Sequence, residues 1–268
     1  MQSMKNFTDL KDKEKKEDLR KLYDAWEKVI SSKDPIFFPD FGKYFDAITY
    51  FNEDGFYPGY FSTSPRILFI GREATGCGND NGVPIDRTIT KYEDWDEELK
   101  GNRFWRRILS LVYGIKNEGR CKFEDLPPAN EILKGMADNN NYGFALINIS
   151  KYSNDKKDKS ADYVLINRFL KDSELEKRNF IREEIELLEP DIIITANLWN
   201  SRINKKYLNM IFPKNNFFKP DDKDEAACMW DFNLNNNIIK LVETYHFSAR
   251  YKDDKKHFYD PVMKLLFK

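Results

Sequence analysis

The chain has 268 residues, of which 41% are hydrophobic and 15% aromatic, so we expect one domain large enough to bury a substantial core. Its 44 basic and 45 acidic residues leave a formal net charge of −1. This balance excludes a global electrostatic attraction to nucleic acid, so any nucleic-acid surface must be local.

The first 65 residues predict a helix followed by a loop. Residues 11–31 place apolar side chains at helical spacing, which predicts an amphipathic helix with one buried stripe. The stripe consists of Leu19, Leu22, Tyr23, Trp26, Val29 and Ile30. Residues 35–65 are rich in aromatic residues, Pro and Gly without a regular period, which predicts an ordered lead-in loop. We expect residues 1–65 to pack on the domain that residues 66–268 form.

Four short, nearly continuous apolar runs predict strands that are buried on both faces, as in a parallel sheet. They cover residues 66–71, 144–148, 191–195 and 238–244. Helical patterns separate them, with apolar stripes over residues 104–115 and 175–188. Asp260 and Pro261 then predict a closing helix that runs to Leu266. The alternation predicts an α/β domain with three layers, helix-sheet-helix, around a central four-stranded parallel sheet.

Polar residues of catalytic types follow the predicted strands. In open parallel sheets the ligand lies outside the carboxyl ends of the strands. Glu73 follows the first strand, Asn148 ends the second and His246 follows the last. Each has an ordinary explanation when taken alone: a loop cap, a turn residue and a buried, hydrogen-bonded histidine. Together they predict one cleft lined by a carboxylate, an amide and an imidazole.

These residues belong to four short motifs that occur in a particular order. The first strand leads into G-R-E-A-T-G at residues 71–76, and the second ends in Asn148. A helix, Pro190 and a buried strand come third, and H-F-S at residues 246–248 comes last. In this order, and over residues 66–266, the chain resembles the uracil-DNA glycosylase superfamily, whose members carry a G-Q-D-P-Y-like motif, a strand ending in Asn, and H-P-S.

The resemblance implies a DNA glycosylase, which flips a base out of the duplex and hydrolyses its N-glycosidic bond without a cofactor. Glu73 would orient or deprotonate the attacking water, His246 would stabilise the leaving base, and Asn148 would read the base edge. The further base-binding candidates are Thr75, Gly76, Arg87 and Tyr92. Either Arg87 or Tyr92 would stack on the base.

Departures from the family pattern bear on the substrate. Glu73 stands where the family has Asp or Asn, Ala74 replaces a Pro, and Phe247 replaces the Pro of H-P-S. Thr75 stands at the position of the Tyr that presses against C5 of a flipped pyrimidine. A smaller side chain leaves room there, so we expect a pyrimidine with a bulky C5 substituent as the target.

Two basic segments are the candidate DNA-binding surfaces. Residues 248–258 follow the histidine motif and predict a loop that wedges the duplex and contacts phosphates. The candidate residues in this loop are Ser248, Arg250, Lys252 and His257. The second basic segment covers residues 151–159 and contributes Lys151. Both segments also carry acidic residues, so solvated loops are the alternative. The predicted partner is DNA with a damaged or modified base, in repair or in defence against phage, with no obligate protein partner.

The three cysteines are too far apart to form a zinc site or a four-thiolate iron–sulfur cluster. We therefore expect no metal and no cofactor. We also expect a cytoplasmic location and no contact with a membrane, because the sequence has neither a membrane-spanning stretch nor a signal peptide. Two other functions fit the same pattern: a non-catalytic nucleic-acid-binding relative, since two of the four motifs are altered, and a hydrolase of free nucleosides or nucleotides.

Overall fold

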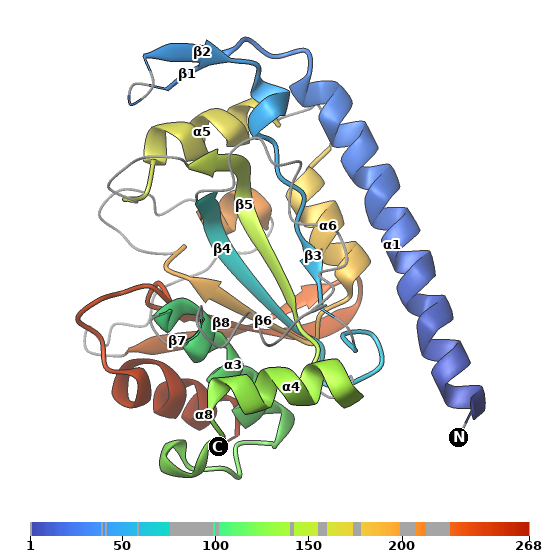
Figure 1. Cartoon of the computed structure of the whole chain (residues 1–268), viewed down its shortest axis with the longest axis vertical. Helices are drawn as coiled ribbons and strands as arrows, with labels where there is room; N and C mark the ends of the chain where they lie inside the picture. Colours follow the sequence, from blue (N-terminus) through green and yellow to red (C-terminus); the bar gives the residue numbers. More distant parts are fainter. Residues whose placement is uncertain are drawn as a thin grey trace. The chain divides into compact units, whose positions relative to one another are not determined.

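The chain is an α/β protein in which helices flank a six-stranded mixed sheet (Figure 1). The computed structural model describes residues 2–38, 40, 42–57, 59–75, 99, 102–139, 142–154, 160–173, 178–198, 207–212 and 226–267. None of the helices in these ranges is long and apolar enough to cross a membrane.

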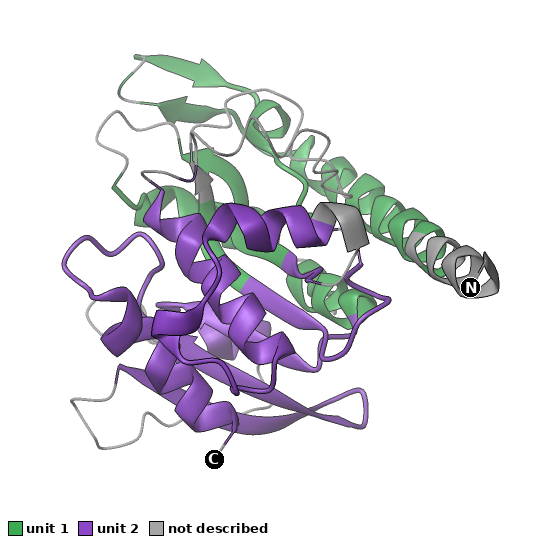
Figure 2. Cartoon of the chain, turned by 60° about the horizontal axis from the view of Figure 1, so that its bottom comes forward, with its two compact units in different colours: residues 1–55, 70–87, 146–188 green, residues 56–69, 88–145, 189–268 purple. Residues whose placement is uncertain are grey.

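Two compact units make up the chain (Figure 2). Unit 1 combines residues 1–55, 70–87 and 146–188, and unit 2 combines residues 56–69, 88–145 and 189–268. Both units are assembled from segments that are distant in the sequence. The boundary that the sequence predicted, after residue 65, does not coincide with any boundary between the two units.

The strands of the sheet follow the order β3-β5-β4-β6-β8-β7. They are β3 (Gly55–Phe56), β4 (Ile67–Thr75), β5 (Ala145–Asn154), β6 (Ile192–Ala196), β7 (Ala227–Leu234) and β8 (Asn237–Thr244). β8 pairs in parallel with β6 and antiparallel with β7. The four predicted strands, β4, β5, β6 and β8, are confirmed and adjacent. The predicted number of strands is wrong, because β3 and β7 add one strand at each edge.

β7 escaped the sequence analysis because its pattern is that of an edge strand. Its buried Phe232 and Leu234 alternate with exposed Asp231 and Asn233, and its apolar first half, residues 227–230, contains no β-branched residue. Its connection to β8 is a polar two-residue turn. Asn235 and Asn236 have φ of 51° and 68°, a left-handed conformation that asparagine tolerates well in two-residue hairpin turns.

β5 is longer than predicted. The apolar run predicts a strand that ends at Asn148, but the strand continues to Asn154. The extension was missed because it contains Ser, Lys and Asn, which are depleted from protein interiors. Here Ser150, Lys151, Ser153 and Asn154 are nonetheless buried. Asn148 therefore lies within the strand and not at its end.

Unit 1 packs its helices around Trp26. These helices are α1 (Gln2–Ile30), α5 (Tyr163–Asp172) and α6 (Phe180–Leu188). The Trp26 ring stacks on Phe180 with a centroid distance of 5.1 Å, and its Nε1 donates a hydrogen bond to Ser173 Oγ at 3.0 Å. The predicted stripe of α1 is confirmed except at half-buried Val29, and α1 begins nine residues earlier than predicted.

The predicted lead-in loop is more regular than expected. It contains an antiparallel hairpin of β1 (Ile36–Phe38) and β2 (Lys43–Phe45), followed by the 3-10 turn η1 (Ala47–Tyr50). Strands of three residues are too short to show a period in the sequence, which explains why the pattern looked irregular.

Unit 2 contains the helices α3 (Arg103–Lys116), α4 (Ala129–Asn139), α7 (Tyr207–Ile211) and α8 (Asp260–Leu266). It also contains the short turns η2 (Phe123–Asp125) and η3 (Lys255–Tyr259), of which η3 is π-helical. Asn102 caps α3 by accepting hydrogen bonds from the backbone N–H groups of Phe104 and Trp105. The predicted helices that correspond to α3 and α8 are confirmed.

Candidate functional site

Glu73 lies near the C-terminal end of β4, in unit 1. Its Oε1 accepts hydrogen bonds from Asn154 Nδ2 and from the backbone N–H of Asp162, both at 3.0 Å. Asp162 is the N-cap of α5, so the carboxylate lies at the positive end of that helix. The other oxygen, Oε2, is buried and has no hydrogen-bond partner in the described ranges. Within the described ranges the carboxylate is thus held at one oxygen only.

Burial raises the pKa of the Glu73 carboxyl above its ordinary value. The hydrogen bonds from Asn154 and Asp162 and the charge of Arg72 counteract this rise, whereas the negative charge of Asp162 adds to it. A raised pKa makes the ionised carboxylate a stronger base than an exposed glutamate, which is what a general base requires.

Asn148 is held by Asp54, a buried residue that the sequence analysis did not identify. Asp54 Oδ2 accepts from the backbone N–H of Asn148 at 2.6 Å, and Oδ1 accepts from Asn148 Nδ2 at 3.3 Å. The amide oxygen points the other way, toward β4. A Cβ atom added at Gly71 would lie 2.4 Å from Asn148 Oδ1, so any larger residue there would displace this amide. The carboxamide of Asn148 therefore has a defined orientation.

Asp54 in turn belongs to a buried cluster with Lys151, Glu184 and Tyr23. Lys151 Nζ donates to Asp54 Oδ2 at 2.6 Å and to Glu184 Oε2 at 2.7 Å. The Tyr23 hydroxyl donates to Glu184 and accepts from the backbone N–H of Asp54 at 2.8 Å. Burial raises the pKa of Glu184 to about 7 against the opposing attraction of Lys151. One cation thus faces two carboxyl groups in this cluster.

This cluster corrects the prediction that Lys151 binds DNA. The side chain of Lys151 is fully buried and paired with two carboxyl groups, so it does not reach a phosphate. A buried lysine needs such pairing because the charge loses its hydration. Both partners come from other parts of the sequence, and nothing next to Lys151 in the sequence predicted them.

His246 follows β8 in unit 2 and is half-buried. Its Nδ1 accepts a hydrogen bond from the backbone N–H of Ser248 at 3.3 Å. In the neutral imidazole the proton is then carried by Nε2, which makes Nε2 a donor. A neutral donor is the form that the predicted role of His246 requires.

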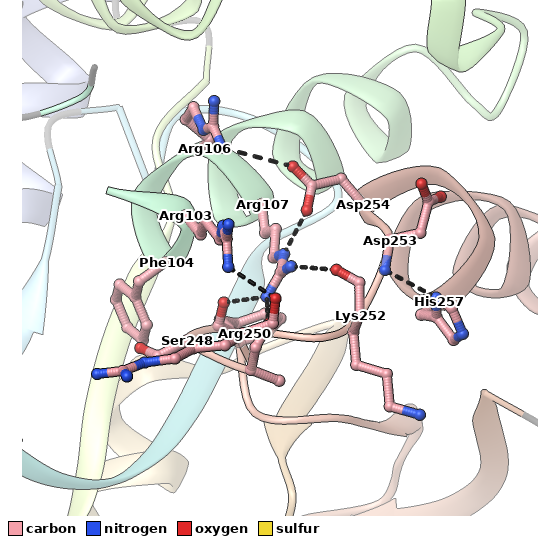
Figure 3. Close-up of polar contacts among 12 residues, drawn as sticks. Arg103, Phe104, Arg106, Arg107, Ser248, Arg250, Lys252, Asp253, Asp254 and His257 are labelled. Atoms are coloured by element: carbon pink, nitrogen blue, oxygen red, sulfur yellow. Dashed lines mark hydrogen bonds and ion pairs between the residues drawn. The ribbon is translucent and has the colours of Figure 1, made fainter. Parts of the chain in front are cut away.

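Buried Arg107 of α3 organises the loop that follows His246 (Figure 3). Its guanidinium donates to the carbonyl oxygens of Phe247, Ala249 and Lys252 at 2.6, 3.0 and 2.6 Å, and to Asp254 Oδ1 at 2.7 Å. Arg103 adds a hydrogen bond to the carbonyl oxygen of Arg250 at 2.7 Å. Because these bonds join backbone carbonyls along the loop to one rigid, buried side chain, the loop is held in one conformation.

The outer side of this loop carries three of the predicted DNA-binding residues, Ser248, Arg250 and Lys252. Ser248 and Arg250 are exposed, and Lys252 Nζ lies 4.0 Å from the ring centroid of Tyr245. Tyr251 is 96% exposed. His257 lies instead in the turn η3, where its Nδ1 accepts from the backbone N–H of Asp253 at 2.9 Å. The predicted loop over residues 248–258 therefore ends before η3.

The remaining predicted site residues are distributed as follows. Glu73 and Asn148 belong to unit 1 and His246 to unit 2, so the single cleft stays a prediction. The side chain of Thr75 lies outside the described residues, as do Gly76, Arg87 and Tyr92. In the described ranges no group of three or more His, Cys, Asp and Glu could hold a metal ion.

Comparisons with known proteins identify no family for this chain. No protein-family model matches it, and a search of curated proteins finds no match.

Proposed function

We propose that the chain is a DNA glycosylase of the uracil-DNA glycosylase type, with the corresponding three-layer fold, that removes a modified pyrimidine from DNA. The observation that carries the proposal is the state of Glu73. Its carboxylate is largely buried, its Oε1 is fixed by Asn154 and Asp162, and its Oε2 has no partner within the described ranges. A fixed carboxylate with one available oxygen and a raised pKa suits a general base that activates water.

In the proposed reaction, Glu73 Oε2 takes a proton from water while the water oxygen bonds to C1′ of the sugar. The electron pair of the C1′–N bond leaves with the base. Positive charge grows on the sugar and negative charge on the base, as in other glycoside hydrolyses. The carboxylate of Glu73 stabilises the positive charge on the sugar, and the Nε2 donor of His246 is assigned to the negative charge on the base. Asn148, held by Asp54, is assigned to the edge of the base.

The loop held by Arg107 supports the DNA-binding part of the proposal. A glycosylase must separate the target base from its neighbours, which costs unstacking energy. A loop that is already ordered loses little conformational entropy when it binds. Arg250 and Tyr251, both exposed on this loop, supply a phosphate-binding charge and an aromatic ring.

Base release from a panel of natural and modified DNAs tests the proposal. The wild type should leave an alkali-labile abasic site, also in the presence of EDTA. Glu73→Gln should slow the chemical step about 100-fold while DNA binding is retained. Glu131→Gln, which changes an exposed glutamate of α4, is the matched control and should behave as wild type.

Two results would replace this proposal by another function. Release of free base from nucleosides alone would indicate a nucleoside hydrolase. Tight DNA binding without product from any DNA would indicate a non-catalytic binding protein.

The expected substrate follows from Thr75 and is tested separately. Release should be faster from DNA with C5-substituted pyrimidines than from uracil DNA, and Thr75→Tyr should selectively abolish release of the substituted base. Efficient release from uracil DNA with no selective effect of Thr75→Tyr would reject this specificity while leaving the glycosylase proposal intact.

A further inference from the structure

Ser150 is a buried polar residue for which the proposed reaction has no role. It lies in β5, two residues beyond Asn148, and is fully buried. Its Oγ has no hydrogen-bond partner within the described part of the chain, which is also true of Glu73 Oε2. Buried polar atoms in proteins are almost always satisfied, if not by protein then by ordered water or a ligand.

Ser150 and Glu73 face the same side of neighbouring strands. β4 and β5 are adjacent in the sheet and run in the same direction (Figure 1). Asn148 Oδ1 lies against Gly71, so these two residues share one face. Side chains two residues apart on a strand point to the same face. Ser150 and Glu73, each two residues further along, therefore also share it.

A hydrogen bond from Asn154 joins the Glu73 carboxylate to the same strand, β5. Asn154 stands four residues beyond Ser150 on β5. Its Nδ2 donates to Glu73 Oε1. The carboxylate of Glu73 is thus bonded to β5 at Oε1, which leaves Oε2 for a further interaction.

We propose that Ser150 Oγ and Glu73 Oε2 together bind one water molecule, and that this water is the nucleophile. Only the role of this water as the nucleophile rests on the proposed function; the water site itself does not. Ser150 Oγ–H donates to the water oxygen, and the water donates to Oε2. The remaining lone pair of the water attacks C1′, the proton passes to Oε2, and the electrons of the broken C1′–N bond leave with the base. Ser150 is thus a water-positioning residue.

The first test measures the pKa of the Glu73 carboxyl by carbon-13 NMR, with Glu73→Gln to assign the signal. Ser150→Ala removes one donor from the water that bonds to the carboxylate, so the pKa should rise by about 0.5 to 1 pH unit. Arg72 and Asp162, the charged groups that act on Glu73, are unchanged in this variant. Ser150→Cys replaces the hydroxyl by a larger thiol that is a weaker donor, and should shift the pKa in the same direction.

Ser153→Ala is the matched control, because Ser153 is an equally buried serine of the same strand. It should leave the pKa of Glu73 unchanged. Equal pKa values in Ser150→Ala and Ser153→Ala would overturn the shared water site. This measurement does not depend on enzymatic activity, so it remains decisive even when no DNA releases a base and the proposed function fails.

The second test is single-turnover base release, where Ser150→Ala should be about 10-fold slower with unchanged DNA affinity. Wild-type release despite a shifted pKa would show that the bound water is not the nucleophile. A high-resolution crystal structure should show one ordered water bonded to both oxygens. A direct hydrogen bond between Ser150 and Glu73 would overturn the proposal.

Discussion

Glu184→Gln probes the buried cluster that holds Asp54 and, through it, Asn148. Glu184 is fully buried, and its pKa is raised from 4.5 to about 7. Between about pH 4.5 and about pH 7 the folded protein therefore binds more protons at Glu184 than the unfolded chain does. The contribution of Glu184 to stability is present below pH 4.5 and is lost as the pH rises through about 7. Gln is neutral at every pH, so Glu184→Gln should not show this loss of stability.

The magnitude follows from the size of the shift. A rise of about 2.5 pH units corresponds to about 3 kcal/mol, of which about 2 to 3 kcal/mol falls between about pH 5 and about pH 8. Burial is complete, so solvent screening does not reduce this value. The free energy of unfolding of the wild type should thus fall relative to that of Glu184→Gln by this amount across the interval.

Urea unfolding of both proteins at about pH 5 and about pH 8 measures the difference. Glu186→Gln, on the same helix but in a partly exposed pair with Arg182, is the control and should follow the wild type. A difference between wild type and Glu184→Gln that does not change with pH would show that Glu184 keeps one charge state. The account of the cluster would then be wrong.

Four further predictions concern the loop and the Glu73 site. Arg107→Lys removes most of the hydrogen bonds to the loop. Limited proteolysis within residues 248–253 should therefore be faster, and the free energy of unfolding should fall by about 2 kcal/mol or more. Tyr251→Ala should leave the urea midpoint unchanged, because the side chain is 96% exposed, but weaken DNA binding about 10-fold in a titration. Gly71→Ala should destabilise by about 1 to 3 kcal/mol in urea, because its Cβ would lie 2.4 Å from Asn148 Oδ1; a stable variant would contradict the close approach. Since Glu73 must be ionised to act as a base, the pH–rate profile should fall as the pH drops through its raised pKa, and a flat profile would argue against this role.

The sequence by itself determined those elements whose signal is local. The buried runs that became β4, β5, β6 and β8 could be predicted because consecutive apolar residues reveal a strand without knowledge of its neighbours. The helices α3 and α8 could be predicted from their apolar stripes and from Asp260 and Pro261. Glu73 stood out because an acidic residue directly after a buried strand is conspicuous.

Only the tertiary structure decided how the polar residues are used. Lys151 looked like a surface lysine, yet it meets Asp54 and Glu184, which lie 97 and 33 residues away in the sequence. Asn148 looked like the end of a strand, yet the strand continues to Asn154, because Lys151 and Asn154 find buried partners. Likewise, Arg107 reaches the carbonyl oxygen of Phe247 across 140 residues. A charged or amide side chain can be buried only where partners compensate its lost hydration, and those partners come from distant segments that folding alone brings together.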